Sequence, residues 1–446
     1  MNYFHKYNNA TVVLNNEFIF DPWLYGSLYY NSWSPDKKTL KKSELKNIKY
    51  CFISHLHQDH WDLDTIKYFS KKTLFIIPDL KINRVIKVFL KKYGYSKILN
   101  VPLKKFTKID NKYSISVVKP LNRDGHEAKN KIYEGKEDIS EIDTGCIIKI
   151  KNDNSHHLLL SDNSPYNEKV FFKDYKNLKI NTAWIPINGY AQDYPFCYDN
   201  ISIKEKKKII QTMNNKRQNF LVKFLKKLKP DLILPYSSTF TLNGKNKRTF
   251  YQTIDKTFFK YKDYCNFSCS KFKIKNIKPL EPYQTLYIDN NVYKIKSDNS
   301  KNIRELKIKN LKNNFFKLKS NYKVKHLDND LNVSLKLLKE RIYKYKLSTG
   351  KINQTTFFIL INKTDKIYKI DFKKFHCSEF NGSKKSIINK FKNYLILKVD
   401  LNIIANILNR KSHINNCIIG FYLNWERYPK NHYNSELHDI LNFLHK

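Results

Sequence analysis

Residues 54–60, Ser-His-Leu-His-Gln-Asp-His, bring three imidazoles and one carboxylate together in one short stretch. The stretch follows Tyr50–Ile53, an apolar run that we expect to be a buried strand. Two histidines two positions apart on an extended segment can converge on one cation, and the Asp-His pair after them can face a second cation. Imidazole and carboxylate suit Zn, Fe or Mn, and the lack of a thiolate argues against a closed structural zinc site. A polar loop rich in histidine is the alternative, but the spacing favours metal ligands: His55, His57, Asp59 and His60.

Such a site needs ligands from other parts of the chain. His126 lies between two expected strands, and Asp162 follows the apolar run 158–160, whose rigid end could fix a carboxylate that bridges two ions. Alone, His126 could be a surface residue and Asp162 a turn residue, but beside the first cluster we predict both as ligands. Asp143 is the competing carboxylate, as a ligand, a partner of a ligand, or a turn residue. Asp21 could orient the histidine loop by hydrogen bonds, or simply form the turn before a proline.

Strand-like and helix-like segments alternate through the first 290 residues, which predicts a layered α/β domain. A hairpin is expected around Asn15-Asn16, between strands at 11–14 and 17–20. Asp64 is expected to cap a helix that ends at Phe69. Further expected elements are a strand at 73–77, a helix at 81–93 and a long amphipathic helix at 202–229.

From about residue 290 the composition changes, and the segment 294–325 is rich in lysine and asparagine. We therefore place a domain boundary between about 290 and 330, with residues 1–290 as the metal-binding domain and 291–446 as a smaller C-terminal α+β domain. Apolar residues at steps of three and four predict a helix over 331–345. A hairpin (355–361 and 367–372), strands at 394–399 and 417–423, and a final helix at 435–445 are expected after it.

The order Asp21, His-x-His-x-Asp-His, His126, Asp162 resembles the metallo-β-lactamase superfamily. That resemblance implies a four-layer αββα sandwich with the metal site at the edge between its sheets. Flanking segments are similar to the catalytic part of CMP-N-acetylneuraminate hydroxylase-like proteins: 20–33 (FDPWLYGSLYYNSW), 141–150 (EIDTGCIIKI), 193–200 (DYPFCYDN) and 427–433 (RYPKNHY).

Two departures from the family pattern affect the interpretation. The superfamily usually supplies a last histidine after a late strand, but residues 234–240 read LPYSSTF, with Tyr236 and no histidine. The hydroxylases also carry a Rieske iron–sulfur domain, and its Cys-x-His and Cys-x2-His pairs do not occur in this sequence. A second ion could be weakly held, completed by another oxygen ligand, or absent, and an oxygenase of this type would need a separate electron donor.

The family resemblance supports two mechanisms of different classes. The first is a hydrolase with one or two Zn²⁺ ions, acting on an ester, a lactone or a phosphodiester. In it, His55, His57 and His126 hold the first ion, Asp59 and His60 hold the second, and Asp162 bridges. If only one ion is present, Asp59 could orient the attacking hydroxide as a catalytic residue. The second is a non-haem Fe²⁺ oxygenase that hydroxylates an N-acyl sugar nucleotide or a similar substrate. A metal-binding scaffold without catalysis is a third alternative.

Substrate-binding groups are expected on the loop 188–200, NGYAQDYPFCYDN. An ordinary turn packed against the domain is an equally good interpretation of this loop. The C-terminal domain could cover the pocket, mediate a homodimer, or be purely structural. The tentative substrate-binding residues are Asn188, Tyr194, Tyr198 and Tyr236.

The 446-residue chain carries 83 basic and 40 acidic residues, a formal net charge of +43. Only eight of the basic residues are arginine, and the lysines are spread along the whole chain. We therefore expect a solvated basic surface that favours a small anionic, phosphate- or nucleotide-bearing substrate, and no specific nucleic-acid binding. The seven scattered cysteines fit reduced thiols in a cytoplasmic protein. No apolar run approaches the ~20 residues of a membrane span.

Overall fold

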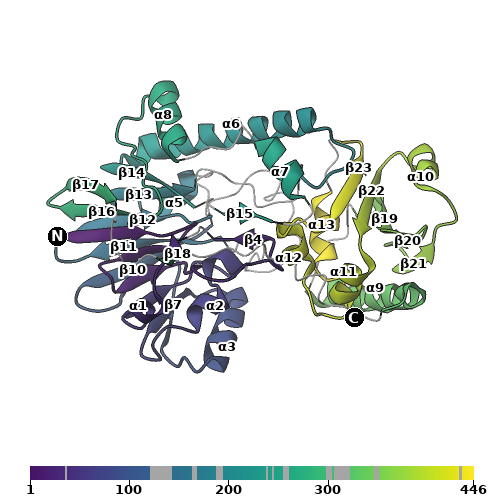
Figure 1. The fold of residues 1–446 in the computed structure, drawn as a ribbon, viewed down its shortest axis with the longest axis horizontal. Coiled ribbons are helices and arrows are strands. Elements are labelled where there is room, and N and C mark those ends of the chain that lie inside the picture. The colour runs from purple at the N-terminus through teal and green to yellow at the C-terminus, as the bar shows by residue number, and fades with distance from the viewer. Residues whose placement is uncertain are drawn as a thin grey trace.

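The computed structural model describes residues 1–35, 38–120, 143–162, 168–186, 194–237, 240–243, 246–254, 261–297, 304–305, 322–345, 350, 352–430 and 434–446. Over this part of the chain, two large mixed sheets form one half of the molecule (Figure 1). The first sheet has the order β17 (Val292–Ser297), β16 (Gln284–Asp289), β1 (Asn2–Lys6), β2 (Val12–Leu14), β3 (Phe18–Phe20), β6 (Tyr50–Phe52), β7 (Leu74–Pro78), β8 (Ile98–Val101). The second has the order β14 (Leu232–Tyr236), β13 (Thr182–Pro186), β12 (Ser155–Leu159), β11 (Gly145–Ile150), β10 (Tyr113–Val118), β9 (Thr107–Lys108).

The two sheets pack face to face because alternate side chains of each strand point into a shared core. On β3, Phe18 and Phe20 enter this core, whereas Ile19 points to the opposite face of the sheet. From the second sheet, Ile115 and Val117 of β10 meet them in the same cluster. The chain therefore forms an α/β sandwich, in agreement with the α/β fold predicted from the sequence.

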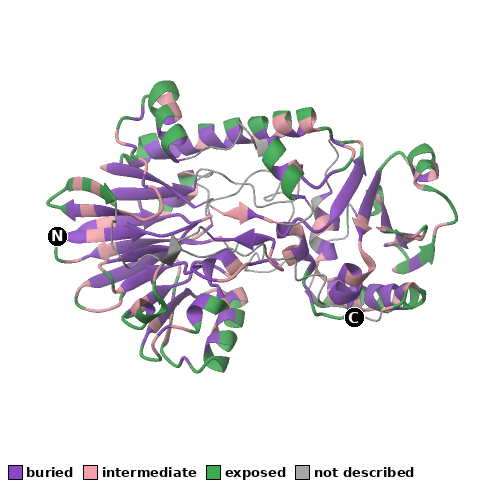
Figure 2. Cartoon of the chain, in the orientation of Figure 1, coloured by how far each residue is buried: buried purple, intermediate pink, exposed green. Residues whose placement is uncertain are grey.

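Helices cover the outer faces of both sheets, as the purple inner faces of the helices in Figure 2 indicate. Leu45, Ile66 and Leu90 pack on the outer face of the first sheet. They belong to α1 (Lys42–Leu45), α2 (Leu63–Ile66) and α3 (Arg84–Lys92). The outer face of the second sheet is covered by α5 (Glu168–Asp174), the C-terminal half of α6 (Ile203–Leu228) and α8 (Tyr261–Phe272).

The local signals around residues 11–66 are mostly confirmed. Asn15 and Asn16 have left-handed φ values of 51° and 55° and form the centre of the turn between β2 and β3, which the Glu17 N–H closes on the Leu14 carbonyl at 3.1 Å. The predicted helix cap is wrong by two residues. Asp62, not Asp64, caps α2, because its carboxylate accepts hydrogen bonds from the backbone N–H groups of Asp64 and Thr65.

The C-terminal part contains a five-stranded sheet within the described residues. Its order is β21 (His376–Glu379), β20 (Ile367–Asp371), β19 (Thr356–Ile361), β22 (Tyr394–Val399), β23 (Asn424–Tyr428). The helices of this part are α9 (Leu327–Tyr345), α10 (Lys384–Lys390), α11 (Leu401–Leu408), α12 (Ile414–Ile419) and α13 (Ser435–Leu441).

The strand predicted at 417–423 is wrong. The chain is helical over Ile414–Ile419, where the His413 side chain accepts a hydrogen bond from the backbone N–H of Asn415 at the start of α12. The strand of this region is β23, which begins at Asn424. A short apolar run does not distinguish a buried strand from a buried helix, which explains the error. The helix predicted at 331–345 is confirmed within α9.

The C-terminal part packs on the loop that follows β3. The Trp33 indole N–H donates to the Ile419 carbonyl at 3.0 Å, and the Tyr422 hydroxyl donates to the Tyr30 carbonyl at 2.5 Å. The Tyr198 backbone also pairs with Trp425 of β23. Two short sheets complete the description: β15 (Thr241–Leu242) with β4 (Trp33–Ser34), and β18 (Arg304–Glu305) with β5 (Lys38–Thr39). α7 (Lys247–Ile254) lies against α6.

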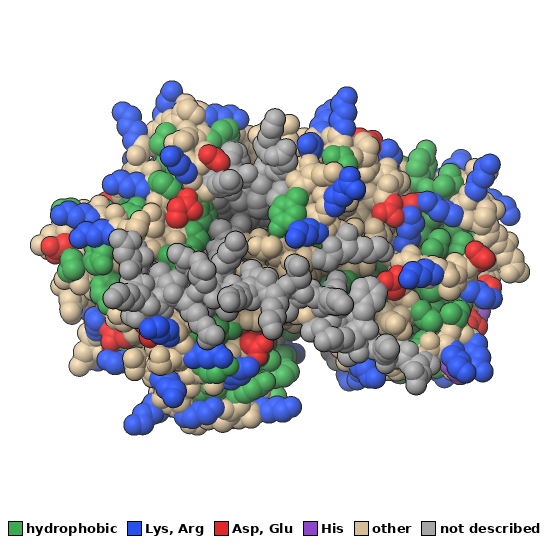
Figure 3. Space-filling model, viewed as in Figure 1, with side chains coloured by type: hydrophobic (Ala, Val, Ile, Leu, Met, Phe, Trp, Pro, Cys, Tyr) green, Lys and Arg blue, Asp and Glu red, His purple; other side chains and the backbone are tan. Residues whose placement is uncertain are grey.

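Over the described parts of the face drawn in Figure 3, lysine and arginine side chains are spread from one end of the molecule to the other. This distribution agrees with the spread of lysines in the sequence. Among the described helices, none has the length and apolar character that crossing a bilayer requires. The position of the domain boundary between about 290 and 330 stays a prediction.

A buried histidine predicts how stability depends on pH. His157 of β12 is fully buried, and its ring lies between the Ser155 and Thr182 hydroxyls, at 2.8 and 2.9 Å. Burial lowers the pKa of His157 to about 3. Below the usual histidine pKa, this histidine binds a proton in the unfolded chain but not in the folded one. We therefore expect the free energy of unfolding to fall by about 1.4 kcal/mol for each pH unit between roughly 6.5 and 3.

Urea unfolding at pH 7, 6 and 5 measures this slope directly. His157→Gln should flatten it, whereas His376→Gln, at an exposed position on β21, should leave it unchanged. Equal slopes in the wild type and the His157 variant would contradict the prediction.

Candidate metal centre

The sheet topology brings those predicted ligands that the structure describes to one rim of the sandwich. β3 and β6 are parallel neighbours, so Asp21 and the loop that begins at Ser54 leave the first sheet at the same edge. β11 and β12 are antiparallel, with Cys146 opposite Leu159, so Asp143 before β11 lies near Asp162 after β12. Carboxylates and imidazoles from four strand ends therefore meet there, although only the histidine loop is contiguous in the sequence.

The first group of candidate ligands is His55, His57 and Asp143. His55 Nε2 lies 3.0 Å from His57 Nδ1 and 3.5 Å from Asp143 Oδ1, and His57 Nδ1 lies 3.7 Å from the same oxygen. Asp143 Oδ1 is buried and accepts no hydrogen bond from any residue that the structure describes. A buried carboxylate oxygen without a hydrogen bond is costly, and a cation between the three atoms would remove that cost.

The second group is His60 with Asp59 and Asp162. His60 Nε2 lies 3.1 Å from Asp162 Oδ2 and 3.3 Å from Asp59 Oδ2. Asp162 Oδ2 also lies 3.9 Å from His55 Nε2, so its carboxylate stands between the two groups. His55, His60 and Asp162 offer ligand atoms that all lie within 4.8 Å of one another.

These separations fit a shared ion. Four ligands about 2.0–2.1 Å from a tetrahedral Zn²⁺ lie roughly 3.3 Å from one another. The cited spacings are 3.0–3.7 Å within the two groups and 3.9 Å between them. The donor set of imidazole nitrogen and carboxylate oxygen suits Zn²⁺ or Fe²⁺. The residues present therefore fit a metal ion.

Asp21 fixes the orientation of His60. Its carboxylate lies 3.0 Å from His60 Nδ1 and accepts hydrogen bonds from the Ser54 backbone N–H at 2.7 Å, the Ser54 hydroxyl at 2.9 Å and the Ser161 hydroxyl. With Nδ1 donating to Asp21, Nε2 is the His60 nitrogen that faces Asp59 and Asp162, and it can bind an ion there once the ion displaces its proton. Asp21 therefore lies beside the histidine loop, in contact with its first and last residues, Ser54 and His60.

Asp59 is held on both carboxylate oxygens by residues that the sequence did not single out as ligand partners. The Tyr29 hydroxyl donates to Oδ1 at 2.7 Å, and the Asn9 side-chain amide donates to Oδ2 at 3.0 Å. Burial and Asp59 together raise the pKa of Tyr29 well above its usual value, so its hydroxyl stays a donor. Tyr29 lies in the segment 20–33, whose family resemblance was the one signal pointing to it; Asn9 had none.

Carboxylates dominate the electrostatics of the second group. Burial alone lowers the pKa of His60, but Asp59, Asp162 and Asp21 outweigh it and hold the pKa well above the usual value. Burial raises the pKa of Asp59, and His60 more than reverses that effect. Burial and the two neighbouring rings hold the pKa of His55 well below its usual value, so its ring is neutral. This environment attracts a cation, whether a proton or a metal ion.

The remaining predicted residues lie elsewhere or outside the described residues. His126 and Asn188 are outside them. Tyr236 is fully buried, and its hydroxyl donates to the Ala10 carbonyl, so it serves the core beneath the rim rather than a substrate surface. Tyr194 and Tyr198 lie against the C-terminal part, where the Arg427 guanidinium stands 4.1 Å and 5.1 Å from their ring centres.

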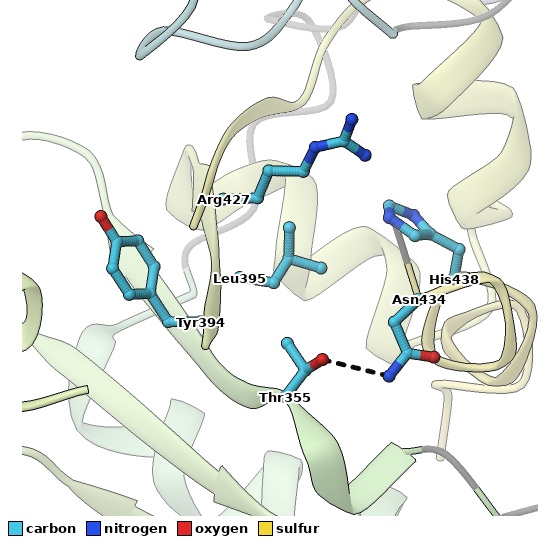
Figure 4. Close-up of a pocket in the computed structure, with 6 residues that line it drawn as sticks. All are labelled: Thr355, Tyr394, Leu395, Arg427, Asn434 and His438. Atoms are coloured by element: carbon cyan, nitrogen blue, oxygen red, sulfur yellow. Dashed lines mark hydrogen bonds between the residues drawn. The ribbon is translucent and has the colours of Figure 1, made fainter. Parts of the chain in front are cut away.

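Arg427 also borders a small cavity of the C-terminal part, shown in Figure 4. The Asn434 amide donates to the Thr355 hydroxyl at 3.2 Å on one side of this cavity, and the His438 ring faces Arg427 across it. The cavity is lined by Thr355, Tyr394, Leu395, Arg427, Asn434 and His438, none of which belongs to the metal centre.

Tyr29→Phe tests whether the hydrogen bond from Tyr29 to Asp59 contributes to ion affinity. The variant keeps the buried ring, which packs edge-on against Trp33, and removes only the donor to Asp59. We expect ion affinity to fall by about 10-fold, at the lower end of what loss of a ligand's hydrogen-bond partner costs. Competition titration with a chelating dye measures it, and Tyr25→Phe, which removes a hydrogen bond to the Leu40 carbonyl, is the matched control. Unchanged affinity in Tyr29→Phe would show that Asn9 alone suffices.

Comparison with known proteins adds a sequence similarity of limited extent. No protein-family model matches the chain. The chain is 23% identical over 245 residues to cytidine monophosphate-N-acetylneuraminic acid hydroxylase of Danio rerio, an alignment that covers 50% of this chain and 35% of that protein. It is 34% identical over 65 residues to a Mycolicibacterium smegmatis protein named for a Rieske 2Fe-2S centre, which covers 14% of this chain and 12% of that protein. The chain thus aligns with about a third or less of these curated relatives.

Two solved structures are similar at low identity. One is a possible metal-dependent hydrolase from Veillonella parvula, with 17% identity, a TM-score of 0.42 and coverage of 65% of this chain and 99% of that one. The other is an isothiocyanate hydrolase from Delia radicum gut bacteria, with 14% identity, a TM-score of 0.43 and the same coverage. The similarity to the hydroxylase confirms the resemblance noted in the sequence.

Proposed function

We propose that the chain is a metal-dependent hydrolase with two ion sites that share one rim. His55, His57 and Asp143 would hold one ion, with His126 as a further candidate. Asp59 and His60 would hold the other, and Asp162 would bridge. The observation that supports this most directly is the position of the Asp162 carboxylate, 3.1 Å from His60 Nε2 and 3.9 Å from His55 Nε2.

When bound, such ions supply a water of pKa near about 7 instead of 15.7, together with a Lewis acid for the scissile oxygen. The residues of the chain supply the orientation. Asp59, fixed by Tyr29 and Asn9, can accept a hydrogen bond from the attacking water and so orient it. We propose an ester, a lactone or a phosphodiester of a small anionic molecule as substrate, since a net charge of +43 raises the encounter rate with anions.

Metal content and hydrolysis measured on one preparation test this proposal. Protein purified without chelators should contain Zn²⁺ and should cleave at least one substrate of a broad panel of lactones, aryl esters and bis-aryl phosphodiesters. Asp162→Asn should lower both ion content and turnover, while Asp153→Asn, a matched aspartate that holds Ser155 near the other end of β12, should alter neither. Zn-loaded protein that cleaves nothing in the panel would contradict the proposal.

A second candidate function is supported by a specific observation. His55, His57 and Asp143 make two imidazoles and one carboxylate, the ligand set of non-haem Fe²⁺ oxygenases. With the hydroxylase similarity, this favours a monooxygenase of an N-acyl sugar nucleotide or a similar substrate, with electrons from a separate protein. Stoichiometric iron in the purified protein, and substrate-dependent O₂ consumption with a chemical reductant, would favour this function; zinc alone would favour the hydrolase.

We also propose the finer description of the architecture. The sandwich would be a four-layer αββα metallo-β-lactamase-like domain, followed by a C-terminal α+β domain that covers the rim or mediates a homodimer. Substrate contacts from Tyr194 and Tyr198, and a cytoplasmic location, belong to the same proposal. A scaffold that binds metal without catalysis is the outcome if both activity tests fail.

A further inference from the structure

α3 exposes apolar side chains on its outer face. Val85, Val88 and Phe89 have exposed fractions of 45%, 65% and 36%, and their spacing of three and four residues places them on one side of the helix. Ile86 and Leu90, on the opposite side, are fully buried against the first sheet. The helix therefore already has its core contact, and the outer apolar stripe, which we call the α3 face, is additional to it.

Basic residues surround the α3 face. Arg84 and Lys91 lie along one side of it on α3, and Lys92 lies within it, whereas Lys87 lies farther round the helix. No acidic residue occurs from Leu80 to Lys97, a segment that carries six basic ones: Lys81, Arg84, Lys87, Lys91, Lys92 and Lys97. Figure 3 shows hydrophobic side chains gathered over α3, with lysine and arginine side chains at their margin. Apolar residues inside a basic margin are typical of helices that lie in the interface of an anionic membrane.

The α3 face adjoins the histidine loop. The Phe89 ring lies 5.8 Å from the ring of Trp61, at an angle of 68°. Trp61 directly follows His60, and its indole N–H donates to the Leu56 carbonyl at 2.6 Å. A surface that contacts α3 would therefore lie beside the loop that carries the candidate ligands.

We propose that the α3 face docks this protein on an anionic lipid surface. Val85, Val88 and Phe89 enter the interface between headgroups and acyl chains, and the basic residues contact the phosphates. A second copy of this chain is disfavoured as the occupant, because pairing two α3 faces would bring twelve basic residues together with no acidic partner on either segment. A nucleic-acid backbone would satisfy the charges but leave Val88 and Phe89 in water. Docking does not depend on the metal chemistry proposed above.

Vesicle sedimentation tests the proposal on the full chain. The probes are vesicles of phosphatidylcholine with phosphatidylglycerol, and vesicles of phosphatidylcholine alone. The test variant carries Val85→Ser, Val88→Ser and Phe89→Ser. The matched control carries Val292→Ser, Val333→Ser and Ile388→Ser, at positions that are 54%, 41% and 48% exposed elsewhere on the surface. The test variant and the control variant both keep the net charge of the wild type. The general attraction of a basic protein to anionic lipid is therefore the same for the two variants.

We expect the wild type and the control to bind the anionic vesicles alike, and the test variant to bind at least about tenfold more weakly. A His57→Ala protein should bind like the wild type, which separates docking from the proposed metal function. Equal binding of the two triple variants would overturn the proposal, because binding would then rest on overall charge. Equal binding of the wild type to both vesicle types, or a dimer in sedimentation velocity that only the test variant loses, would overturn it as well.

Discussion

His55→Ala is expected to empty both halves of the metal centre, whereas His57→Ala empties only one. His55 Nε2 lies 3.0 Å from His57 Nδ1 on one side and 3.9 Å from Asp162 Oδ2 on the other, so its ring faces both groups. His57 Nδ1 lies near His55 and Asp143 only, among the candidate ligands that the structure describes. Removing the shared ring therefore weakens two ion sites at once.

The size of the effect follows from the role of a ligand. Loss of a group that only hydrogen-bonds to a ligand costs about 10- to 100-fold in affinity, and loss of the ligand itself should cost more. Metal analysis after dialysis should find two ions per chain in the wild type, about one in His57→Ala and close to none in His55→Ala. Turnover, measured on whichever substrate the panel yields, should fall below detection in His55→Ala.

A matched control is available on β12. His156 is partly buried, packs near Phe106 and takes no part in the cluster, so His156→Ala should keep the wild-type ion content. Two ions retained by His55→Ala, or an ion content that falls equally in all three variants, would contradict the assignment of His55 as the shared residue.

Two kinds of candidate site residue could be recognised from the sequence: those that are neighbours along the chain, and those that directly follow a strand. The histidine loop was visible because its candidate ligands lie within six residues, and Asp162 because a carboxylate after an apolar run is held by a rigid strand end. The hairpin at 12–20 was predictable for a similar reason, since Asn15 and Asn16 suit the left-handed turn on their own. Local chemistry determines each of these features.

The residues that hold Asp59 could not be predicted in that way. Asn9 is 50 positions and Tyr29 30 positions from Asp59, and neither residue type indicates a long-range partner. Their contacts exist because the loop after β1 and the loop after β3 fold over the same rim. Tyr236 was predicted to contact substrate because of its place in the stretch where the family usually has a late histidine. In the structure its hydroxyl donates a hydrogen bond to the Ala10 carbonyl inside the fold.

Asp21→Ala is expected to weaken both the fold and the ion site, because Asp21 accepts more hydrogen bonds than any other residue described at this rim. It is 1% exposed, and four donors from Ser54, Ser161 and His60 converge on its two oxygens. Alanine would leave these donors buried without an acceptor, at about 1–3 kcal/mol for each that water cannot reach. We expect a loss of about 3–5 kcal/mol in the free energy of unfolding, the range found when a buried charged partner is removed.

Asp21→Asn separates the two consequences. An amide of the same shape can still accept from the Ser54 backbone, so most of the stability should remain. Its N–H₂ group, however, would face His60 Nδ1, which would then have to act as an acceptor and place its proton on Nε2, toward Asp59 and Asp162. A ring protonated on Nε2 cannot bind metal there, so ion affinity at the second group should fall by about 10- to 100-fold.

Urea unfolding of chelator-treated protein measures the free energy of unfolding, and competition titration with a chelating dye measures the ion affinity. Asp64→Ala is the control, since that carboxylate is 59% exposed and pairs only with Lys67 at 2.5 Å among the ion pairs of the described residues. Full ion affinity in Asp21→Asn would mean that the His60 tautomer is not set by Asp21, and the second group would then have to bind its ion through Asp59 and Asp162 without the imidazole.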